Sequence, residues 1–185
     1  MSLSRVPLFV WFVVPTVILV VVGAWFVSKA LNSQPNPDST RPEAVSKPVE
    51  GTVDYDIVGR NHVAEGTTVS TYNSNPPSSG PHWPAPTKNG IYDTTLADEQ
   101  LVHNLEHGYV WISYKSDVGD DVKNALKKMV EDDNWKTVLE PRDKNETPIA
   151  LAAWGRVLKM DSADYDKIKA FIKIYRNRGP EKTPD

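Results

Sequence analysis

Hydrophobic and polar positions divide the chain into stretches with different patterns. Residues 6–27 are apolar throughout and contain no charged side chain, which is enough length for a helix to cross a bilayer. Residues 28–50 are rich in Pro, Ser and charge, a composition typical of an extended tether. Residues 51–185 show the short amphipathic periods of a folded domain. The sequence therefore predicts a tail at residues 1–5, a transmembrane anchor, a linker and one domain.

The periods within residues 51–185 alternate between those of strands and those of helices. Together they predict an α+β fold in which a single small mixed β-sheet is covered by two to three helices and is preceded by the transmembrane helix. The predicted strands cover residues 53–57, 109–114, 136–139 and 148–154, and the predicted helices cover residues 96–107, 120–132 and 163–178. The strand at 148–154 is apolar enough to be central, and Asp161 or Ser162 can cap the last helix.

A cleaved signal peptide is the alternative to an uncleaved anchor, because Ser28 and Ala30 are small residues spaced as a signal peptidase requires. The apolar run is longer than the about 7–15 residues of a secretory signal, so we expect residues 6–27 to remain as a single-pass anchor. Because a five-residue tail is easily left inside, we expect a cytoplasmic N-terminus and an extracytoplasmic domain, in the periplasm or on the cell surface.

Histidine supplies the candidate chemistry. The chain has four histidines and no cysteine, so a transition-metal site would be built from imidazole and carboxylate groups. His103 and His107 are spaced i, i+4 on a predicted helix, which places both rings on one face where they can share a metal ion. A histidine in the last turn of a helix can instead interact with the helix dipole, but that role does not explain the pair.

Glu106 completes a His-x-x-Glu-His order, in which inverzincin peptidases use two zinc ligands and a general base. A five-residue motif with three fixed positions is weak evidence for an enzyme, so metal-dependent hydrolysis with Glu106 as the base is an alternative. We expect Glu106 to orient a histidine instead, or to act as a ligand if the helix is distorted.

The other two histidines lie in irregular segments. His82 follows Pro81 within residues 73–88, a proline-rich stretch that cannot be regular structure. Restricted backbone on both sides would hold His82 in place as a ligand, and Trp83 could shield the site, although a loop histidine often donates to a carbonyl instead. His62 lies in a predicted turn and joins the site only if the fold brings it there.

Charge argues against nucleic acid as a partner, because the chain has 21 Lys and Arg against 24 Asp and Glu.

Several runs of residues are similar to those of a bacterial family of membrane-anchored or secreted proteins catalogued as a domain of unknown function. The runs are YNSNPPSSGPHW (residues 72–83), GIY (90–92), VHNLEHGYV (102–110), AAWGR (152–156) and RGPE (178–181). The resemblance covers residues 61–181 and all four histidines, and it implies an exported location without an established activity.

These observations predict a membrane-tethered extracytoplasmic domain that binds one Cu(II) or Zn(II) ion through His103, His107, His82 and His62. Without cysteine or a nearby methionine, Cu(I) is disfavoured. The alternatives are the hydrolase with Glu106 as base and an accessory subunit of a membrane complex, in which the histidines are hydrogen-bonded within the fold and other membrane proteins are the partners.

Overall fold

The computed structural model describes residues 19–29, 40–45 and 47–184, and these belong to two compact units. The first unit contains residues 19–29, which are helical with exposed side chains. No helix in these described ranges has both the length and the hydropathy needed to cross a bilayer. The predicted anchor at residues 6–27 lies partly outside the described residues, so it stays a prediction.

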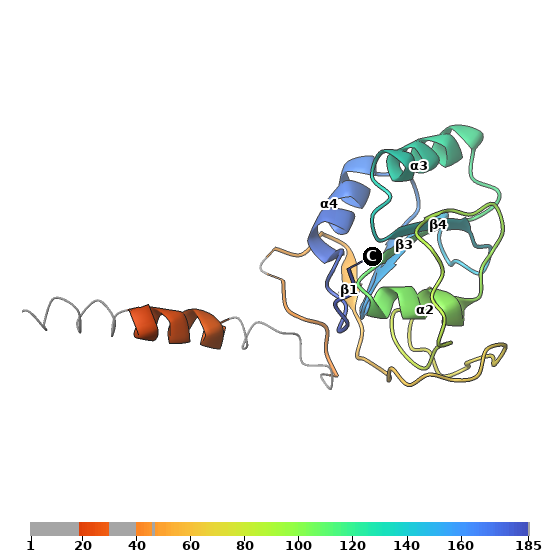
Figure 1. The fold of residues 1–185 in the computed structure, drawn as a ribbon. Coiled ribbons are helices and arrows are strands. Elements are labelled where there is room, and N and C mark those ends of the chain that lie inside the picture. The colour runs from red at the N-terminus through yellow and green to blue at the C-terminus, as the bar shows by residue number, and fades with distance from the viewer. Residues whose placement is uncertain (1–18, 30–39, 46, 185) are drawn as a thin grey trace, which may run out of the picture. The chain divides into compact units, whose positions relative to one another are not determined.

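The second unit is built on one six-stranded mixed sheet, ordered β1-β6-β5-β3-β4-β2 (Figure 1). The pairs β2–β4 and β3–β4 are parallel, whereas β3–β5, β5–β6 and β1–β6 are antiparallel. The elements are, in chain order, β1 (Thr52–Asp54), β2 (Gly90–Ile91), α2 (Asp98–Glu106), β3 (Val110–Tyr114), α3 (Asp120–Asp132), β4 (Thr137–Pro141), β5 (Ile149–Ala153), β6 (Arg156–Met160) and α4 (Tyr165–Tyr175).

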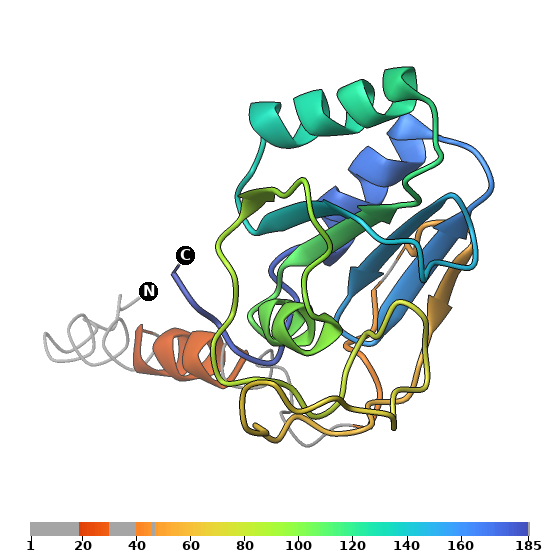
Figure 2. The same ribbon diagram turned by 90° about the vertical axis from the view of Figure 1, so that its right-hand side faces the viewer.

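Helices cover both faces of the sheet. Alternate residues of a strand point to opposite faces, and β3 shows this directly: Ile112 joins a core under α3 and α4, and Trp111 joins a core under α2. Figure 2 shows α2 on one side of the sheet with α3 and α4 on the other. The predicted α+β class with one mixed sheet is therefore confirmed, and α2 lies apart from the other two helices.

Most predicted elements are present, and α3 has the predicted bounds. The predicted strand at 53–57 is shorter, because β1 ends at Asp54 at the sheet edge and has only β6 as a partner. The sequence did not predict β2 or β6. Strand β6 forms a hairpin with β5, in which Ala153 pairs with Arg156 across a two-residue turn. Gly155 in that turn has φ of +68°, a conformation that favours glycine.

The predicted cap of the last helix was wrong. Helix α4 begins after Asp164, whose carboxylate accepts a hydrogen bond from Lys167 N at 2.9 Å. Both Asp161 and Ser162 lie outside the first turn, so neither can reach the free N–H groups there. The helix ends at Tyr175 instead of near residue 178, and Asn177 adopts a left-handed conformation with φ of +60°.

The end of the predicted linker packs on the domain. Val49 is buried in the core under α3 and α4, and its N–H donates to Tyr175 Oη at 3.1 Å. Thr40 O accepts from Ile57 N at 2.8 Å. The packed domain therefore begins before residue 51, where the sequence placed its boundary. The average composition of residues 28–50 does not reveal single apolar residues such as Val49.

Candidate functional site: a buried histidine and carboxylate cluster

Helix α2 carries two of the residues that form the site, His103 and Glu106. Asp98 and Glu99 lie in its first turn, where carboxylates interact favourably with the helix dipole. Gly108, with φ of +82°, follows its last residues. His103 and Glu106 are one turn apart and both are buried, with exposed fractions of 4% and 2%. The helix therefore presents an imidazole and a carboxylate on the same side.

The proline-rich loop is held against α2 by hydrogen bonds to its backbone. Asn104 accepts from Thr87 N at 2.9 Å and donates to Thr87 O at 2.7 Å. Tyr72 donates to Pro81 O at 2.8 Å, and burial, followed by the charges of Glu99 and Asp98, raises the pKa of Tyr72 so that its hydroxyl remains a donor. The loop is thus an ordered part of the site.

A short parallel bridge brings His62 beside His82. Val63 N donates to His82 O at 2.8 Å, and His82 N donates to Asn61 O at 3.1 Å. His82 is fully buried and His62 is exposed. Two segments that are irregular in sequence therefore hold their imidazoles together through the backbone.

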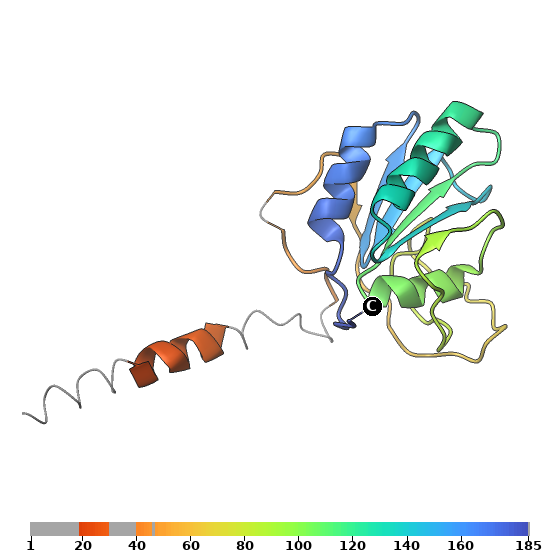
Figure 3. The ribbon, with the colours of Figure 1, turned by 45° about the horizontal axis from the view of Figure 1, so that its top comes forward.

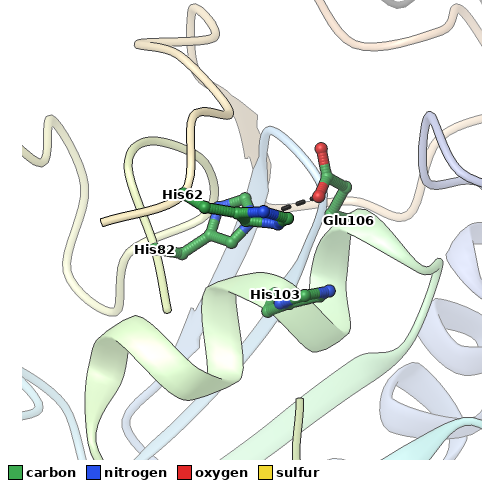
Figure 4. Close-up of side chains that lie close together, drawn as sticks. All are labelled: His62, His82, His103 and Glu106. Carbon is green, nitrogen blue, oxygen red and sulfur yellow. Dashed lines mark hydrogen bonds and ion pairs between the residues drawn. The ribbon is translucent and has the colours of Figure 1, made fainter. Parts of the chain in front are cut away.

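One ligand atom from each of His62, His82, His103 and Glu106 lies within 4.8 Å of the others. Figure 4 shows these four side chains close together, with the His82–Glu106 contact dashed. The ring centroids of the three histidines are 4.9 to 5.1 Å apart. A group of this composition could hold a metal ion. The exposed His62 leaves one side of the cluster open to solvent.

The orientation of two rings follows from their hydrogen bonds to the backbone. The Nδ1 atom of His82 lies 2.8 Å from Gly80 O, and that of His103 lies 2.6 Å from Trp83 O. A carbonyl oxygen only accepts, so both Nδ1 atoms donate. Burial lowers the pKa of His103, and charge on His107 or His82 would lower it further, against the opposing effect of the Trp83 bond. His103 is therefore neutral near pH 7, with a lone pair on Nε2.

Glu106 connects the cluster to the guanidinium of Arg60. Its Oε2 lies 3.0 Å from His82 Nε2, and its Oε1 lies 3.6 Å from Arg60 Nη1. Because His82 Nδ1 already donates to Gly80 O, the contact with Glu106 requires a proton between Nε2 and Oε2. A metal ion would displace that proton, since metal ligands bind in their deprotonated forms.

His107 adds a fourth ring beside His103, with the two ring centroids 4.6 Å apart. Its Nε2 lies 3.1 Å from His103 Nε2 and 3.3 Å from Glu181 Oε2. Since His103 Nε2 carries the lone pair, His107 Nε2 donates. His107 Nδ1 is buried and has no hydrogen-bond partner among the described residues. His107 therefore lies beside the four-residue group and is not a member of it. Its neighbour Glu106 supplies the fourth ligand atom instead.

The rings of all four predicted histidines thus lie next to one another: three form a triangle with sides of about 5 Å, and His107 lies beside His103. His62 had the weakest support in the sequence, because its position depends on a backbone bridge that no local pattern reveals. Trp83 contributes its backbone carbonyl to His103, and its indole donates to Thr67 O at 2.9 Å. No sequence pattern indicated Arg60 as a neighbour of the site, and Glu181 was indicated only as part of the RGPE run.

An α+β domain with a buried histidine and carboxylate cluster is the class of protein that the fold and the site define. A family model described as a protein of unknown function, DUF3105, matches residues 62–185. The chain belongs to this family, as the resemblance of its motifs predicted, and the match includes all four histidines. No curated protein and no solved structure matches the chain.

Proposed function

We propose that this protein is a membrane-anchored extracytoplasmic domain that binds one transition-metal ion, Cu(II) or Zn(II). The ligands are the Nε2 atoms of His82 and His103, a ring nitrogen of His62 and the carboxylate of Glu106. His107 borders this set and can replace a ligand. The anchor at residues 6–27 and the extracytoplasmic location rest on the apolar run alone.

One observation carries the metal proposal: the buried imidazoles of His82 and His103 are fixed by Nδ1–H bonds to backbone carbonyls, which leaves each Nε2 available as a ligand. A ring nitrogen of each lies within 4.8 Å of the other ligand atoms of the cluster. Metal-ligating histidines almost always donate their other ring N–H to a carbonyl, a carboxylate or water, which fixes the ring orientation. Here this support comes from Gly80 and Trp83, in the loop that Asn104 ties to α2.

A purely structural role accounts less well for the arrangement. The His82–Glu106 contact alone would satisfy both buried side chains. It does not require His62 and His103 to lie with ring centroids about 5 Å from His82. Imidazoles held this close repel one another when protonated. A shared cation removes that penalty and uses every facing lone pair.

The donor types select the metal. Imidazole suits copper and zinc, and the chain contains no cysteine to favour Cu(I). Bonds of about 2.1 Å place tetrahedral ligands about 3.4 Å apart, so any donor atoms that lie farther apart, up to the 4.8 Å limit of the cluster, draw together on binding. The exposed His62 is the ligand with most room to move, because the other three side chains are buried.

Metal uptake by the purified full-length chain tests the proposal. We expect about one equivalent of copper or zinc by elemental analysis, and Cu(II) spectra with nitrogen ligation from several imidazoles. His103→Ala should lower the affinity by more than the about 10–100-fold that is typical of losing an outer partner. No stoichiometric uptake of either metal would refute the proposal.

Glu106→Gln separates ligation from catalysis, and Glu99→Gln is its matched control. Glu99 is also buried on α2, but it accepts from Val69 N at 2.8 Å, outside the cluster. If Glu106 is a ligand, Glu106→Gln weakens metal binding and Glu99→Gln does not. The open side at His62 favours metal-dependent hydrolysis as a second candidate. In that case Glu106→Gln would retain the metal and lose turnover.

A further inference from the structure

A groove of about 770 Å³ lies between α3 and α4, on the face of the sheet opposite α2. Figure 3 shows the two helices running beside each other over that face. Small-molecule sites in proteins typically have volumes of about 300–1,000 Å³. The groove is therefore large enough for a ligand, and its place in the fold makes it independent of the histidine cluster.

The inner lining of the groove is apolar. Met129 of α3 and Ile172 of α4 line it from the two helices, and Trp135 lines it from the segment after α3. Trp135 is 44% exposed, and the guanidinium of Arg176 lies 5.1 Å from its ring centroid. An indole that is left this exposed beside an apolar groove provides a surface on which a hydrocarbon chain can pack.

Two cations on one side of the groove have no ion-pair partner among the described residues. They are Lys169 and Lys173, which are one turn apart on α4, and the hydroxyl of Tyr165, one turn before them, likewise has no described hydrogen-bond partner. All three line the groove. Together they form a compact set of donors for one anionic head group.

The remaining charges of the groove are already paired. Lys128 lies 2.9 Å from Asp132, and Arg176 lies 2.8 Å from Asp133. A docked acidic helix would place charges along both rims, whereas the unpaired cations here occupy a single site. This distribution fits one anion with one apolar tail, because only one end of such a ligand is charged.

We infer that the groove between α3 and α4 binds a long-chain fatty acid, with its carboxylate at Lys169 and Lys173 and its alkyl chain along Met129, Ile172 and Trp135. The carboxylate pairs with two ammonium groups that otherwise have none, and the tail removes the exposed indole from water. This site requires no metal and is separated from the histidines by the sheet.

Photo-cross-linking to the full-length chain in phosphatidylcholine nanodiscs tests this inference. The probe is palmitate with a diazirine in its alkyl chain, and the modified peptides are mapped by mass spectrometry. We expect cross-links in α3, α4 and the segment that contains Trp135. Excess palmitate should suppress them, and hexadecanol, which lacks the carboxylate, should not.

Charge reversal provides the matched comparison. Lys169→Glu combined with Lys173→Glu should lower the groove cross-links about tenfold, the factor that about 1.4 kcal/mol produces. Lys88→Glu combined with Lys144→Glu makes the same change in net charge at two exposed lysines that do not line the groove, and it should leave the yield unchanged. Ala125→Trp, which keeps both groove lysines, should block the groove sterically and abolish the cross-links.

Three outcomes would overturn the inference. The first is a set of cross-links that maps outside α3, α4 and the Trp135 segment. The second is equal suppression by palmitate and hexadecanol, which would mean that the carboxylate is not recognised. The third is unchanged groove labelling in the Lys169→Glu and Lys173→Glu double variant or in Ala125→Trp, which would mean that neither the two lysines nor the groove holds the probe.

Discussion

Replacing Gly179 by alanine should destabilise the domain through steric overlap with the backbone at the end of α2. The C-terminal segment passes directly over the end of α2: Glu181 N donates to Glu106 O at 3.1 Å, and Asn177 N donates to Gly108 O at 2.7 Å. A Cβ on Gly179 would lie 2.7 Å from the carbonyl carbon of Glu106, and closer still to Glu106 O and Gly108 N. These are backbone atoms, so no flexible side chain can move aside.

The size of the effect follows from separating steric overlap from backbone strain. Forcing extra atoms into packed structure typically costs about 1–3 kcal/mol, and the rigid neighbours here place Gly179→Ala near the upper end, at about 3 kcal/mol. Gly66 has φ of +87° and no atom within 4 Å of its added Cβ, so Gly66→Ala should cost only the left-handed conformation, about 1–2 kcal/mol. Gly108→Ala combines both costs, because φ is +82° and the Cβ would lie 2.8 Å from Asn177 Cα.

Urea unfolding of the full-length chain, followed by Trp fluorescence, measures all three variants under the same conditions. We expect the free energy of unfolding to fall least for Gly66→Ala and clearly more for both Gly179→Ala and Gly108→Ala. If Gly179→Ala costs no more than Gly66→Ala, the close approach of residues 177–181 to α2 is wrong. The position of Glu181 beside His107 would then be wrong as well.

Three further predictions concern charge, capping and metal. Burial raises the pKa of Glu140 to about 7 from 4.5. Between these two pH values the folded state therefore binds more protons than the unfolded state. The free energy of unfolding should therefore fall by about 3 kcal/mol as pH rises through this range, and Glu140→Gln should remove this slope in pH-dependent urea titrations. Asp164→Ala should cost about 1 kcal/mol by loss of the α4 cap, in the same assay at fixed pH. Cu(II) or Zn(II) at 100 times its Kd should stabilise the chain by about 2.7 kcal/mol in thermal unfolding, and a chelator should reverse this gain. An equal gain in His103→Ala at the same metal concentration would contradict the assigned ligands.

The fold was predictable where the pattern is local. Helix α3 has a clear apolar stripe and was predicted with its observed bounds. The predicted strand at 148–154 is β5, which lies inside the sheet. Strand β2 has only two residues, Gly90–Ile91, and exists because β4 pairs with it. No periodicity can be read from two residues, so such an element follows from the rest of the sheet.

The candidate site was predictable in its chemistry and only partly in its membership. The absence of cysteine and the i, i+4 spacing of His103 and His107 directed attention to imidazole and carboxylate donors. Spacing alone could not show that His107 Nε2 would point to His103 and Glu181, while Glu106 would point to His82. Adjacent residues of a helix, such as Glu106 and His107, point in directions about 100° apart. Segments distant in the sequence decide which groups each of them meets.

The sequence by itself determined which groups are available: four histidines, one glutamate beside two of them, and a rigid proline-rich loop. The tertiary structure decided which of them meet. The backbone bridge between His62 and His82 joins residues twenty positions apart, and the bonds from Asn104 to Thr87 fix the loop on α2. These contacts form only when the sheet and α2 are in place, because their favourable free energy must exceed the entropic cost of ordering the loop. A local pattern therefore identifies the donors, and packing over long sequence distances assembles the site.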